Sequence, residues 1–301
     1  MENLIEFIKA KEIGKYLTDV SIAKYTSYKV GGIVKCIVYP NDVKKLICLL
    51  KYIRANNIKY KILGNGSNTL FSSKEYDGVI IKLDALNNIE FIDNKIVVGA
   101  GYSLIKLCIQ AARKSLAGLE FASGIPGTVG GAVYMNAGAY KSDMGYVVQK
   151  VKVLTPEFKV ITMTNKELKF HYRDSFFMHH RDYICLEVTL KLVRGSKADI
   201  MAVNEERRKR RQESQPLEYP SAGSVFRNPE GMFAGKLIED IGLKGLTKGG
   251  AQISNKHANF IINLGNAKAE DIKGLIDFVK DTVLEKYGVN LKVEQEFVNW
   301  E

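Results

Sequence analysis

The sequence predicts an α+β protein in which helices and strands follow one another irregularly along 301 residues. Strand-like and helix-like patterns intermix without a strict strand–helix–strand repeat. No G-x-G-x-x-G opens a helix after a first strand, which disfavours a Rossmann dinucleotide site. Two loops of small residues interrupt the patterns, and a chain of this length can form two or three domains.

In the first half of the chain, apolar residues recur at helical spacing and predict a helix over 42–55. Short apolar runs predict strands at 59–63, 79–83 and 95–98. Ser103 is a suitable N-cap for the helix that follows it, because its hydroxyl can accept a hydrogen bond from a backbone amide of the first turn.

In the second half, strands are expected at 150–154 and 184–193 and a charged helix over 199–212. The polar, proline-marked stretch after that helix predicts a domain junction. The remaining elements are expected to be helices at 233–240 and 271–286 and a last strand at 291–298. Alternation along this strand would place Glu294 and Glu296 on the same face.

The composition is that of a globular protein, with 46% hydrophobic and 26% charged residues. The net charge is +11, but the basic residues are spread along the chain apart from the run 207–211. No aromatic residues interleave with that run, so we expect no nucleic-acid binding. Most of the run should be a solvated helix face, and contact with a ligand phosphate stays an open alternative. The amino terminus lacks the basic residues and apolar core of a signal peptide, and no apolar run has the roughly 18 residues of a membrane span. We therefore expect a cytoplasmic protein without a membrane partner.

Cysteine and histidine indicate neither a disulfide nor a metal. The cysteines form no C-x-x-C pair and lie among apolar neighbours, which predicts buried free thiols at Cys36, Cys48, Cys108 and Cys185. His179 and His180 have no third ligand at a metal-binding spacing, so we expect no metal site.

The most informative stretch runs from Ser123 to Tyr140, where five of eighteen residues are glycine and none is charged. Ordered glycine costs conformational entropy, so a dense run indicates positive φ angles or a backbone that approaches a ligand. A second small-residue loop spans Leu63–Asn68. A simple turn explains one glycine there, but less easily a pair of glycines with Ser67 and Asn68. The two loops together favour a large anionic cofactor held by backbone amides.

Polar clusters elsewhere indicate chemistry only weakly when each is taken alone. The segment Gly223–Pro229 places a hydroxyl, a cation and an amide after a proline turn, which fits either an ordinary Ser/Thr turn or a proton-donating serine. The segment Phe170–Ser175 combines aromatic, cationic and hydroxyl groups. A carboxylate such as Glu294 on a strand usually just faces solvent.

Taken in order, these motifs resemble the UDP-N-acetylenolpyruvoylglucosamine reductase family of flavoenzymes. The matching segments span nearly the whole chain: Tyr25–Gly32, Leu63–Asn68, Gly99–Gly101, Gly118–Gly131, Met135–Tyr140, Tyr172–Ser175, Ala222–Pro229, Gly249–Gln252 and Glu285–Gly288 with Glu294. The resemblance implies the FAD-binding fold of the vanillyl-alcohol-oxidase (PCMH) type in two subdomains, followed by a C-terminal α+β substrate domain. The expected boundaries are 1–84, 85–196 and 197–301.

The resemblance also implies an activity: NADPH-dependent, FAD-mediated reduction of UDP-N-acetylglucosamine enolpyruvate to UDP-N-acetylmuramate. This step serves peptidoglycan synthesis, and through it cell-wall formation, cell shape and division. The expected catalytic residues are Arg173, which stabilises a developing enolate, Glu294, which polarises or protonates the same group, and Ser224, which delivers a proton. Because no histidine lies in the glycine-rich loops, we expect non-covalent FAD, and we expect a monomer.

The family's cofactor contacts carry over to eighteen positions: Tyr28, Leu63, Gly64, Asn65, Gly66, Ser67, Asn68, Gly124, Ile125, Pro126, Thr128, Gly130, Gly131, Ala132, Asn136, Gly138, Ala139 and Arg227. Substrate contacts are expected at Tyr134, Tyr172, Asn228 and His257. In the segment 254–259, Lys256 and Asn259 are open alternatives to His257. The chain between Arg173 and Ser224 has no room for the inserted tyrosine loop of one subclass, so the shorter subclass is expected.

Two other functions remain open on sequence grounds. The first is another non-covalent FAD oxidoreductase of the same fold, which would bleach with a reductant but would not be reoxidised by the enolpyruvyl nucleotide. The second is a basic nucleotide- or nucleic-acid-binding protein without catalysis, which would show no flavin spectrum and a strongly salt-dependent affinity for a polyanion.

Overall fold

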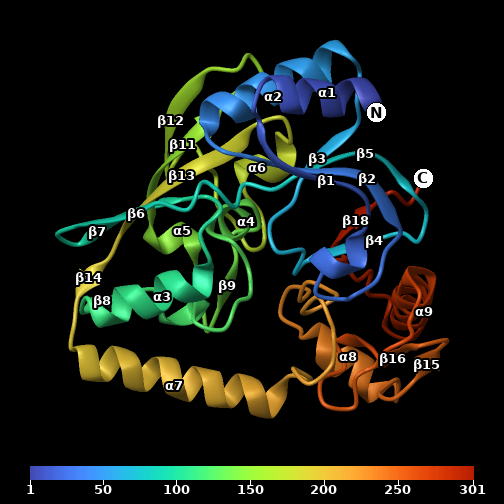
Figure 1. The fold of residues 1–301 in the computed structure, drawn as a ribbon. Coiled ribbons are helices and arrows are strands. Elements are labelled where there is room, and N and C mark those ends of the chain that lie inside the picture. The colour runs from blue at the N-terminus through green and yellow to red at the C-terminus, as the bar shows by residue number, and fades with distance from the viewer. The chain divides into compact units, whose positions relative to one another are not determined.

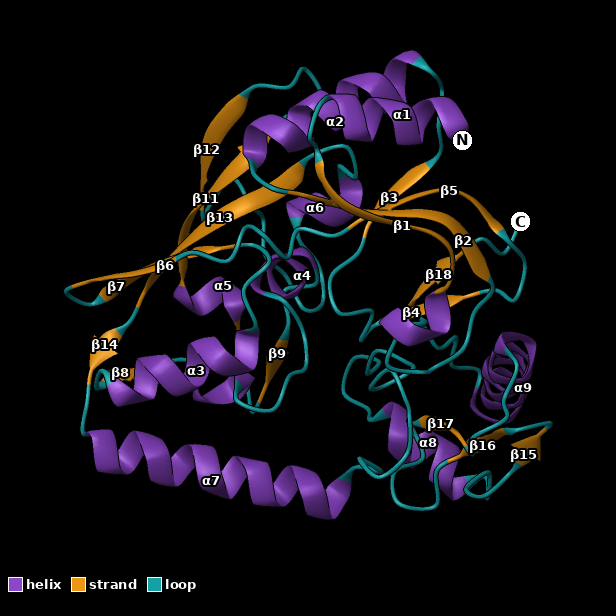
Figure 2. Cartoon of the chain, in the orientation of Figure 1, coloured by secondary structure: helices purple, strands orange, loops and turns teal.

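A computed structural model describes residues 1–301 (Figure 1). Its elements are α1 (Glu2–Ala10), β1 (Gly14–Ser21), η1 (Ile22–Tyr25), β2 (Ile33–Pro40), α2 (Val43–Ala55), β3 (Tyr60–Ile62), β4 (Thr69–Phe71), β5 (Tyr76–Ile81), β6 (Ile89–Ile92), β7 (Lys95–Gly99), α3 (Leu104–Arg113), β8 (Leu116–Ala117), η2 (Glu120–Ala122), α4 (Val129–Tyr134), β9 (Gly138–Ala139), β10 (Ser142–Asp143), α5 (Met144–Val147), β11 (Val148–Leu154), β12 (Val160–Thr164), α6 (Phe176–His179), β13 (Ile184–Lys191), β14 (Val193–Arg194), α7 (Lys197–Ser214), α8 (Ala234–Asp240), β15 (Thr247–Lys248), β16 (Ala251–Ile253), β17 (Ile261–Asn263), α9 (Ala269–Tyr287) and β18 (Glu296–Val298). Helices and strands intermix along the chain (Figure 2), which confirms the α+β class.

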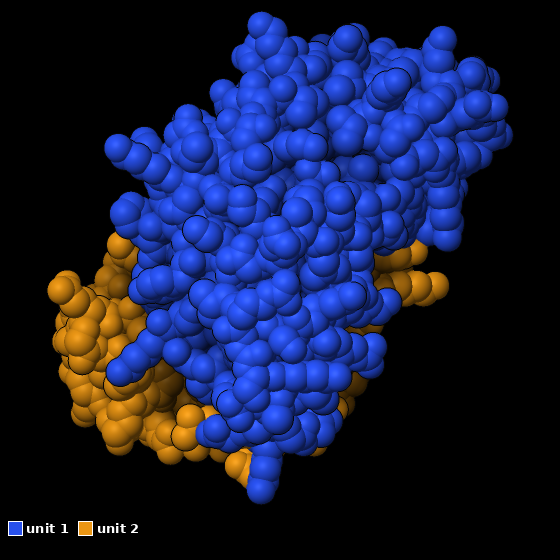
Figure 3. Space-filling view, turned by 90° about the vertical axis from the view of Figure 1, so that its left-hand side faces the viewer, with its two compact units in different colours: residues 1–18, 36–64, 78–209 blue, residues 19–35, 65–77, 210–301 orange.

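The chain forms two compact units, coloured separately in Figure 3. Unit 1 comprises residues 1–18, 36–64 and 78–209, and unit 2 comprises residues 19–35, 65–77 and 210–301. Each unit is therefore assembled from segments that are far apart in sequence. The division into three contiguous domains at 84 and 196 stays a prediction.

The largest sheet lies in unit 1 and has the strand order β12-β11-β13-β7-β6, with antiparallel neighbours throughout. Its central strand β13 is almost entirely buried, since Val188 pairs with Val151 on one side and Val98 on the other. Helix α4 packs against β13 and β7. This packing fixes the glycine-rich segment, which enters α4, on the central strands of the sheet.

A four-stranded sheet with the order β1-β2-β5-β3 carries the first small-residue loop. Strands β3 and β5 are parallel and in register, with Ile62 opposite Ile81, so the chain leaves both strands at the same edge. Helices α1 and α2 lie side by side (Figure 1), and the rings of Phe7 and Tyr52 stack with 4.0 Å between their centroids.

Unit 2 has its own apolar core, in which α9 packs against the antiparallel sheet β15-β16-β17. The buried face of α9 carries Ile272, Leu275, Ile276, Val279 and Val283 at helical spacing. The helix ends at Gly288, whose φ of +67° suits glycine at this position. Strand β18 pairs in parallel with β4, with Glu296 opposite Thr69.

Most of the predicted elements are confirmed, with bounds that differ by a few residues. The helices at 42–55, 199–212, 233–240 and 271–286 correspond to α2, α7, α8 and α9, and Ser103 accepts a hydrogen bond from the Lys106 amide at the start of α3. Three of the four cysteines are buried free thiols, whereas Cys48 is only partly buried.

Three further structural expectations need correction. The last strand covers only Glu296–Val298, because the residues before it make a single isolated bridge, between Val293 and Phe226. The strand expected at 184–193 is interrupted after Lys191 and resumes as β14, which pairs with β8. The glycine-rich run is not a single loop, because Thr128 caps α4 inside it through a hydrogen bond from the Gly131 amide.

Candidate active site

In unit 1, the glycine-rich segment is held in place by its entry into α4. Gly127 O accepts a hydrogen bond from Leu104 N, and Val129 N donates to Tyr102 O. Gly130 N donates to Ala100 O at 2.8 Å, and a Cβ on Gly130 would lie 2.9 Å from the Ala100 Cβ. Gly130 is therefore required for close packing of α4, which accounts for one of the glycines without a ligand.

Gly64 lies beside the same helix start. A Cβ at Gly64 would lie 2.7 Å from Thr128 Oγ1, so any side chain at this position would require Thr128 to move. On another side, Lys82 Nζ donates to Gly64 O at 2.5 Å. This cradle brings Gly64 and Thr128 together, two residues expected to contact the cofactor, as well as Lys82, which was not predicted.

The other cofactor positions predicted in unit 1 are distributed around α4. Leu63 follows β3 and its amide donates to Ile81 O, and Ala132 is buried within α4. Ala139 pairs with Ser142 in the small sheet of β9 and β10. Gly124, Ile125 and Pro126 form the approach to α4, in which Ile125 N donates to Ala122 O.

Arg173 lies at the tip of a tight turn closed by reciprocal backbone hydrogen bonds between His171 and Asp174. Its φ is +53°, a region that side-chain-bearing residues adopt at a cost. Arg173 Nη2 donates to Gly138 O at 2.6 Å, and its guanidinium lies 5.2 Å from the centroid of the half-exposed Tyr172 ring. Two groups predicted for substrate chemistry, Arg173 and Tyr172, are thus adjacent.

Asn136 holds this turn in place. Its side chain is buried, with Nδ2 donating to His171 O at 2.7 Å and Oδ1 accepting from Gly145 N at 2.9 Å. Ser175 Oγ likewise donates to Tyr134 O at 2.6 Å. These bonds assign the Asn136 side chain a structural role, so they do not support its predicted contact with the cofactor.

In unit 2, the loop after Asn65 packs on the segment 25–27. Gly66 has a φ of +61°, and a Cβ there would lie 2.4 Å from Tyr25 O. Gly66 O accepts hydrogen bonds from both the amide and the hydroxyl of Ser27. Asn68 is bound to the last part of the chain, since its Nδ2 donates to Glu294 O at 3.1 Å and its O accepts from Glu296 N at 2.9 Å.

The segments that carry Ser224 and Glu294 run antiparallel beside each other. Glu294 N donates to Val225 O at 2.8 Å, Arg227 N donates to Lys292 O at 2.9 Å, and Phe226 bridges with Val293. Ser224 therefore directly precedes Val225, the residue whose carbonyl accepts from Glu294 N. Through Asn68, the same glutamate is joined to the predicted pyrophosphate loop.

Arg227 presents a buried donor that no protein group satisfies. Its Nε is inaccessible and has no hydrogen-bond partner. A buried unsatisfied donor on a cation is costly. Because protein atoms cover the Nε, its unpaired N–H does not support the predicted cofactor contact of Arg227. Its neighbour Asn228 uses its side-chain oxygen to accept from the Ala234 amide at 3.0 Å, at the start of α8.

The three alternatives for a substrate contact in the segment 254–259 differ in what their side chains already bind. Asn259 is buried, and its side chain bonds both backbone groups of Phe226, at 2.9 and 2.8 Å. Lys256 is exposed and donates to Gln212 O. His257 Nδ1 accepts from Asn259 N at 3.2 Å, which leaves Nε2 to carry the proton of a neutral ring. Burial lowers the pKa of His257, and nearby Lys244 adds to this shift.

Tyr28 has a structural role that the sequence did not predict. Its fully buried ring donates its hydroxyl to Gln295 Oε1 at 3.0 Å, and burial raises the pKa of this phenol. Gln295 Nε2 in turn donates to Ala222 O at 3.2 Å, two residues before Ser224. The phenol of Tyr28 thereby supports the serine segment, and its predicted cofactor contact has no support from its side chain.

The predicted site residues thus form a set in each unit. Unit 1 brings together Gly64, Thr128, the start of α4 and the Arg173 turn, whereas unit 2 brings together the Gly66–Asn68 loop, Ser224, Glu294 and Arg227. Sequence reasoning missed Gln295 and Lys82. The only signal for Lys82 was a charged residue in the apolar run 79–83.

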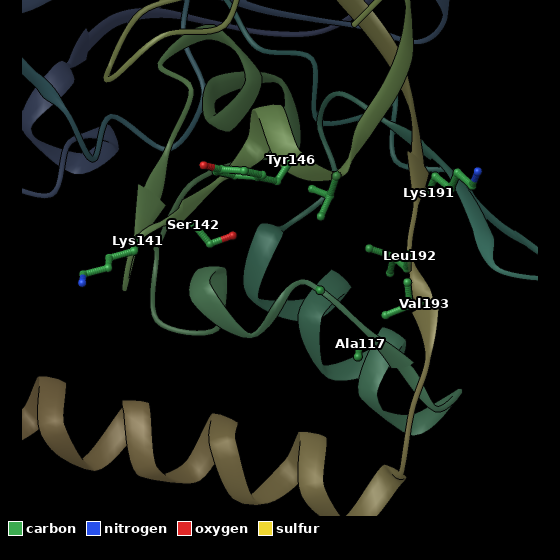
Figure 4. Close-up of a pocket in the computed structure, with 9 residues that line it drawn as sticks. Ala117, Lys141, Ser142, Tyr146, Lys191, Leu192 and Val193 are labelled. Carbon is green, nitrogen blue, oxygen red and sulfur yellow. The ribbon is translucent and has the colours of Figure 1, made fainter.

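Other features of the structure lie outside these sets. No group of three or more His, Cys, Asp or Glu side chains could hold a metal ion, and no helix is long and apolar enough to cross a membrane. Unit 1 also has an open cavity of about 370 Å³ (Figure 4), whose lining includes Ser142, Tyr146 and Leu192. None of the predicted catalytic, cofactor or substrate residues lines it.

Comparison with known proteins finds similarity along nearly the whole chain. Residues 34–164 match the profile of an FAD binding domain, and residues 215–298 match that of the C-terminal domain of UDP-N-acetylenolpyruvoylglucosamine reductase. The reductase of Halalkalibacterium halodurans is 45% identical over 299 residues, 99% of each chain. That of Caldanaerobacter subterraneus is 45% identical over 293 residues, 96% of this chain and 97% of its own. The crystal structure of the reductase from Thermus caldophilus has a TM-score of 0.78 at 35% identity, covering 94% of this chain and 98% of that one.

Proposed function

This chain belongs to the family of UDP-N-acetylenolpyruvoylglucosamine reductases, and from that premise we propose which of its residues carry out the reaction. The enzyme is an FAD-containing oxidoreductase that uses NADPH to reduce UDP-N-acetylglucosamine enolpyruvate to UDP-N-acetylmuramate, a step of peptidoglycan precursor synthesis. The roles of individual residues are inferred from their contacts.

The matched FAD binding domain, residues 34–164, contains both small-residue segments. Within that domain, Gly64 and Gly66 pack closely on Thr128 and on the segment 25–27, which holds the loop against neighbouring protein segments. We therefore assign the FAD pyrophosphate to the loop Gly64–Asn68 and the segment Gly124–Gly131 to the neighbourhood of the flavin ring. When bound, FAD supplies the transfer of hydride from NADPH to the enolpyruvyl group.

The chain's own residues stabilise and protonate the reacting group. Arg173 is held by Gly138 O at 2.6 Å. We assign its fixed charge to the substrate carboxylate, where it would stabilise the developing enolate. The Ser224 hydroxyl gives its proton to the carbon beside that carboxylate, because a carbanion there is far more basic than an alkoxide. Glu294 polarises the same enolate that Arg173 stabilises. The observation that carries these roles is the pairing of Glu294 N with Val225 O, next to Ser224.

The proton donor is tested by separating the two half-reactions in stopped-flow absorbance. In Ser224→Ala, reduction of the flavin by NADPH should keep its wild-type rate, since no proton from Ser224 is needed. Reoxidation by the enolpyruvyl nucleotide should slow by about 10²- to 10⁴-fold, the usual contribution of a general acid. Ser221→Ala is the matched control and should leave both rates unchanged. Equal slowing of both half-reactions would show that Ser224 is not the donor.

The choice between this activity and another FAD oxidation is made with the wild-type protein. Anaerobic NADPH should bleach the flavin band, and UDP-N-acetylglucosamine enolpyruvate should restore it. A flavin that bleaches without being restored by this nucleotide would contradict the substrate assignment and leave the FAD site intact. The substrate contacts proposed for His257, Asn228, Tyr134 and Tyr172 would then lose their basis.

A further inference from the structure

Lys82 is a nearly buried cation whose ammonium group points at the backbone of Gly64. The reason is strand register: β3 and β5 are parallel with Ile62 opposite Ile81, so the residues that follow leave the sheet side by side. Only 7% of the Lys82 side chain is exposed. Its Nζ lies 2.5 Å from Gly64 O, the carbonyl of the first glycine in the small-residue loop.

The protein itself leaves this ammonium incompletely satisfied. A lysine head group has three N–H donors, and Gly64 O accepts from one of them. The nearest carboxylate oxygen, Asp84 Oδ1, lies 3.5 Å from Lys82 Nζ, which is longer than a good charge-assisted hydrogen bond. The Asp84 side chain is also 51% exposed to solvent. A buried cation with so few partners is unfavourable unless another anion completes its shell.

The surroundings of Gly64 fit a phosphate as that anion. The cradle of Gly64, Thr128 and Lys82 lies within one compact unit, and Gly64 packs closely on the Thr128 side chain. Glycine-rich backbone beside a lysine is a recurrent way to bind phosphate, because amides and the ammonium both donate to its oxygens. Lys82 therefore adds a full positive charge to the segment already assigned to the pyrophosphate.

We propose that Lys82 is a cofactor-binding residue whose ammonium group pairs with the pyrophosphate of FAD while holding the carbonyl of Gly64. This inference rests on the proposed assignment of the pyrophosphate to Gly64–Asn68. The competing explanation is purely structural: Lys82 only holds the Gly64 carbonyl, and its charge faces no ligand. The two explanations differ in what a residue that replaces Lys82 must supply. Pairing with pyrophosphate requires a positive charge, whereas holding the Gly64 carbonyl requires only a hydrogen-bond donor.

The test measures the dissociation constant of FAD for the apoprotein, from the change in flavin fluorescence on binding. Lys82→Gln keeps an N–H donor for Gly64 O but removes the charge, whereas Lys82→Met removes both. If the charge pairs with pyrophosphate, both variants should bind FAD about 10- to 100-fold more weakly, the usual loss for a hydrogen bond to a charged group. Lys191→Met, at an exposed lysine of the same unit, should bind FAD like wild type.

Each other outcome overturns the proposal. Wild-type affinity in Lys82→Gln with a loss only in Lys82→Met would show that the residue merely holds Gly64. Affinity within twofold of wild type in both variants would show that Lys82 does not contact FAD. Urea unfolding of the apoproteins identifies a loss that comes from misfolding, and the exposed-site control identifies a general effect of charge. If wild-type apoprotein itself failed to bind FAD, the proposed function would fall as well, so the two failures are distinguishable.

Discussion

Replacing Gly66 by alanine tests whether the small-residue loop is shaped by close approach of the backbone. Gly66 has a φ of +61°, and a Cβ there would lie 2.4 Å from Tyr25 O and 2.9 Å from Thr26 Cα. Both neighbours are backbone atoms, which cannot rotate away as a side chain can. The variant must therefore accept an unfavourable φ and also displace the segment 25–27.

The expected destabilisation has two parts. Placing an L-residue in the left-handed region costs about 1–2 kcal/mol, and overpacking a well-packed site costs a further ~1–3 kcal/mol. Gly66→Ala should thus lower the free energy of unfolding by about 2–5 kcal/mol. Gly231→Ala is the matched control, because Gly231 has a φ of +69° and no atom lies within 4 Å of the place that its Cβ would take. Gly231→Ala should therefore show only the cost of the left-handed φ and not the cost of overpacking.

The assay is urea denaturation of the two apo variants and the wild type, followed by titration with FAD. Gly66→Ala should exceed Gly231→Ala by about 1–3 kcal/mol in unfolding free energy and should bind FAD more weakly, whereas Gly231→Ala should bind FAD like wild type. Equal destabilisation by the two substitutions would refute the reasoning, since it would mean that the segment 25–27 yields without cost. Normal FAD affinity in Gly66→Ala would separately contradict the loop's role in binding.

Two further predictions concern the substrate-side segment. Asn259→Ala leaves the amide and carbonyl of Phe226 buried without partners, so urea denaturation should show that the free energy of unfolding falls by about 2–5 kcal/mol. The control Asn255→Ala, at an exposed position, should stay within about 0.5 kcal/mol of wild type. Similar values for both variants would contradict the role of Asn259 in binding the Phe226 backbone. Burial lowers the pKa of His257, so the unfolded chain protonates this imidazole at a higher pH than the folded protein does. The neutral imidazole therefore contributes to the free energy of unfolding above about pH 6.5, and this contribution is lost as pH falls through the pKa of the folded state. Unfolding free energy should therefore fall less steeply below that pH in His257→Gln, and an NMR titration that gave His257 an ordinary pKa would contradict this.

Local patterns along the chain were sufficient for most elements and for the family. Helical spacing of apolar residues predicted α2 and α9, because the residues on their buried faces are three and four positions apart in the sequence. The same logic failed for the last strand, where 291–298 alternates well but only Glu296–Val298 finds a partner in β4. Strand pairing depends on a distant segment, so alternation alone cannot fix its length.

The roles of individual polar residues depended on contacts that no local pattern shows. Tyr28 and Gln295 are 267 positions apart, and only the folded chain shows that the phenol supports the serine segment. Asn136 and Asn259 resemble ligand-binding residues in the sequence, yet their side chains bond backbone groups. Lys82 is the reverse case, since strand register turns a charged residue in an apolar run toward Gly64. The sequence by itself determined the family, the cofactor class and most helices, because these depend on residue type and spacing. Only the tertiary structure decided which donors are already satisfied, because each hydrogen bond depends on where a distant part of the chain lies.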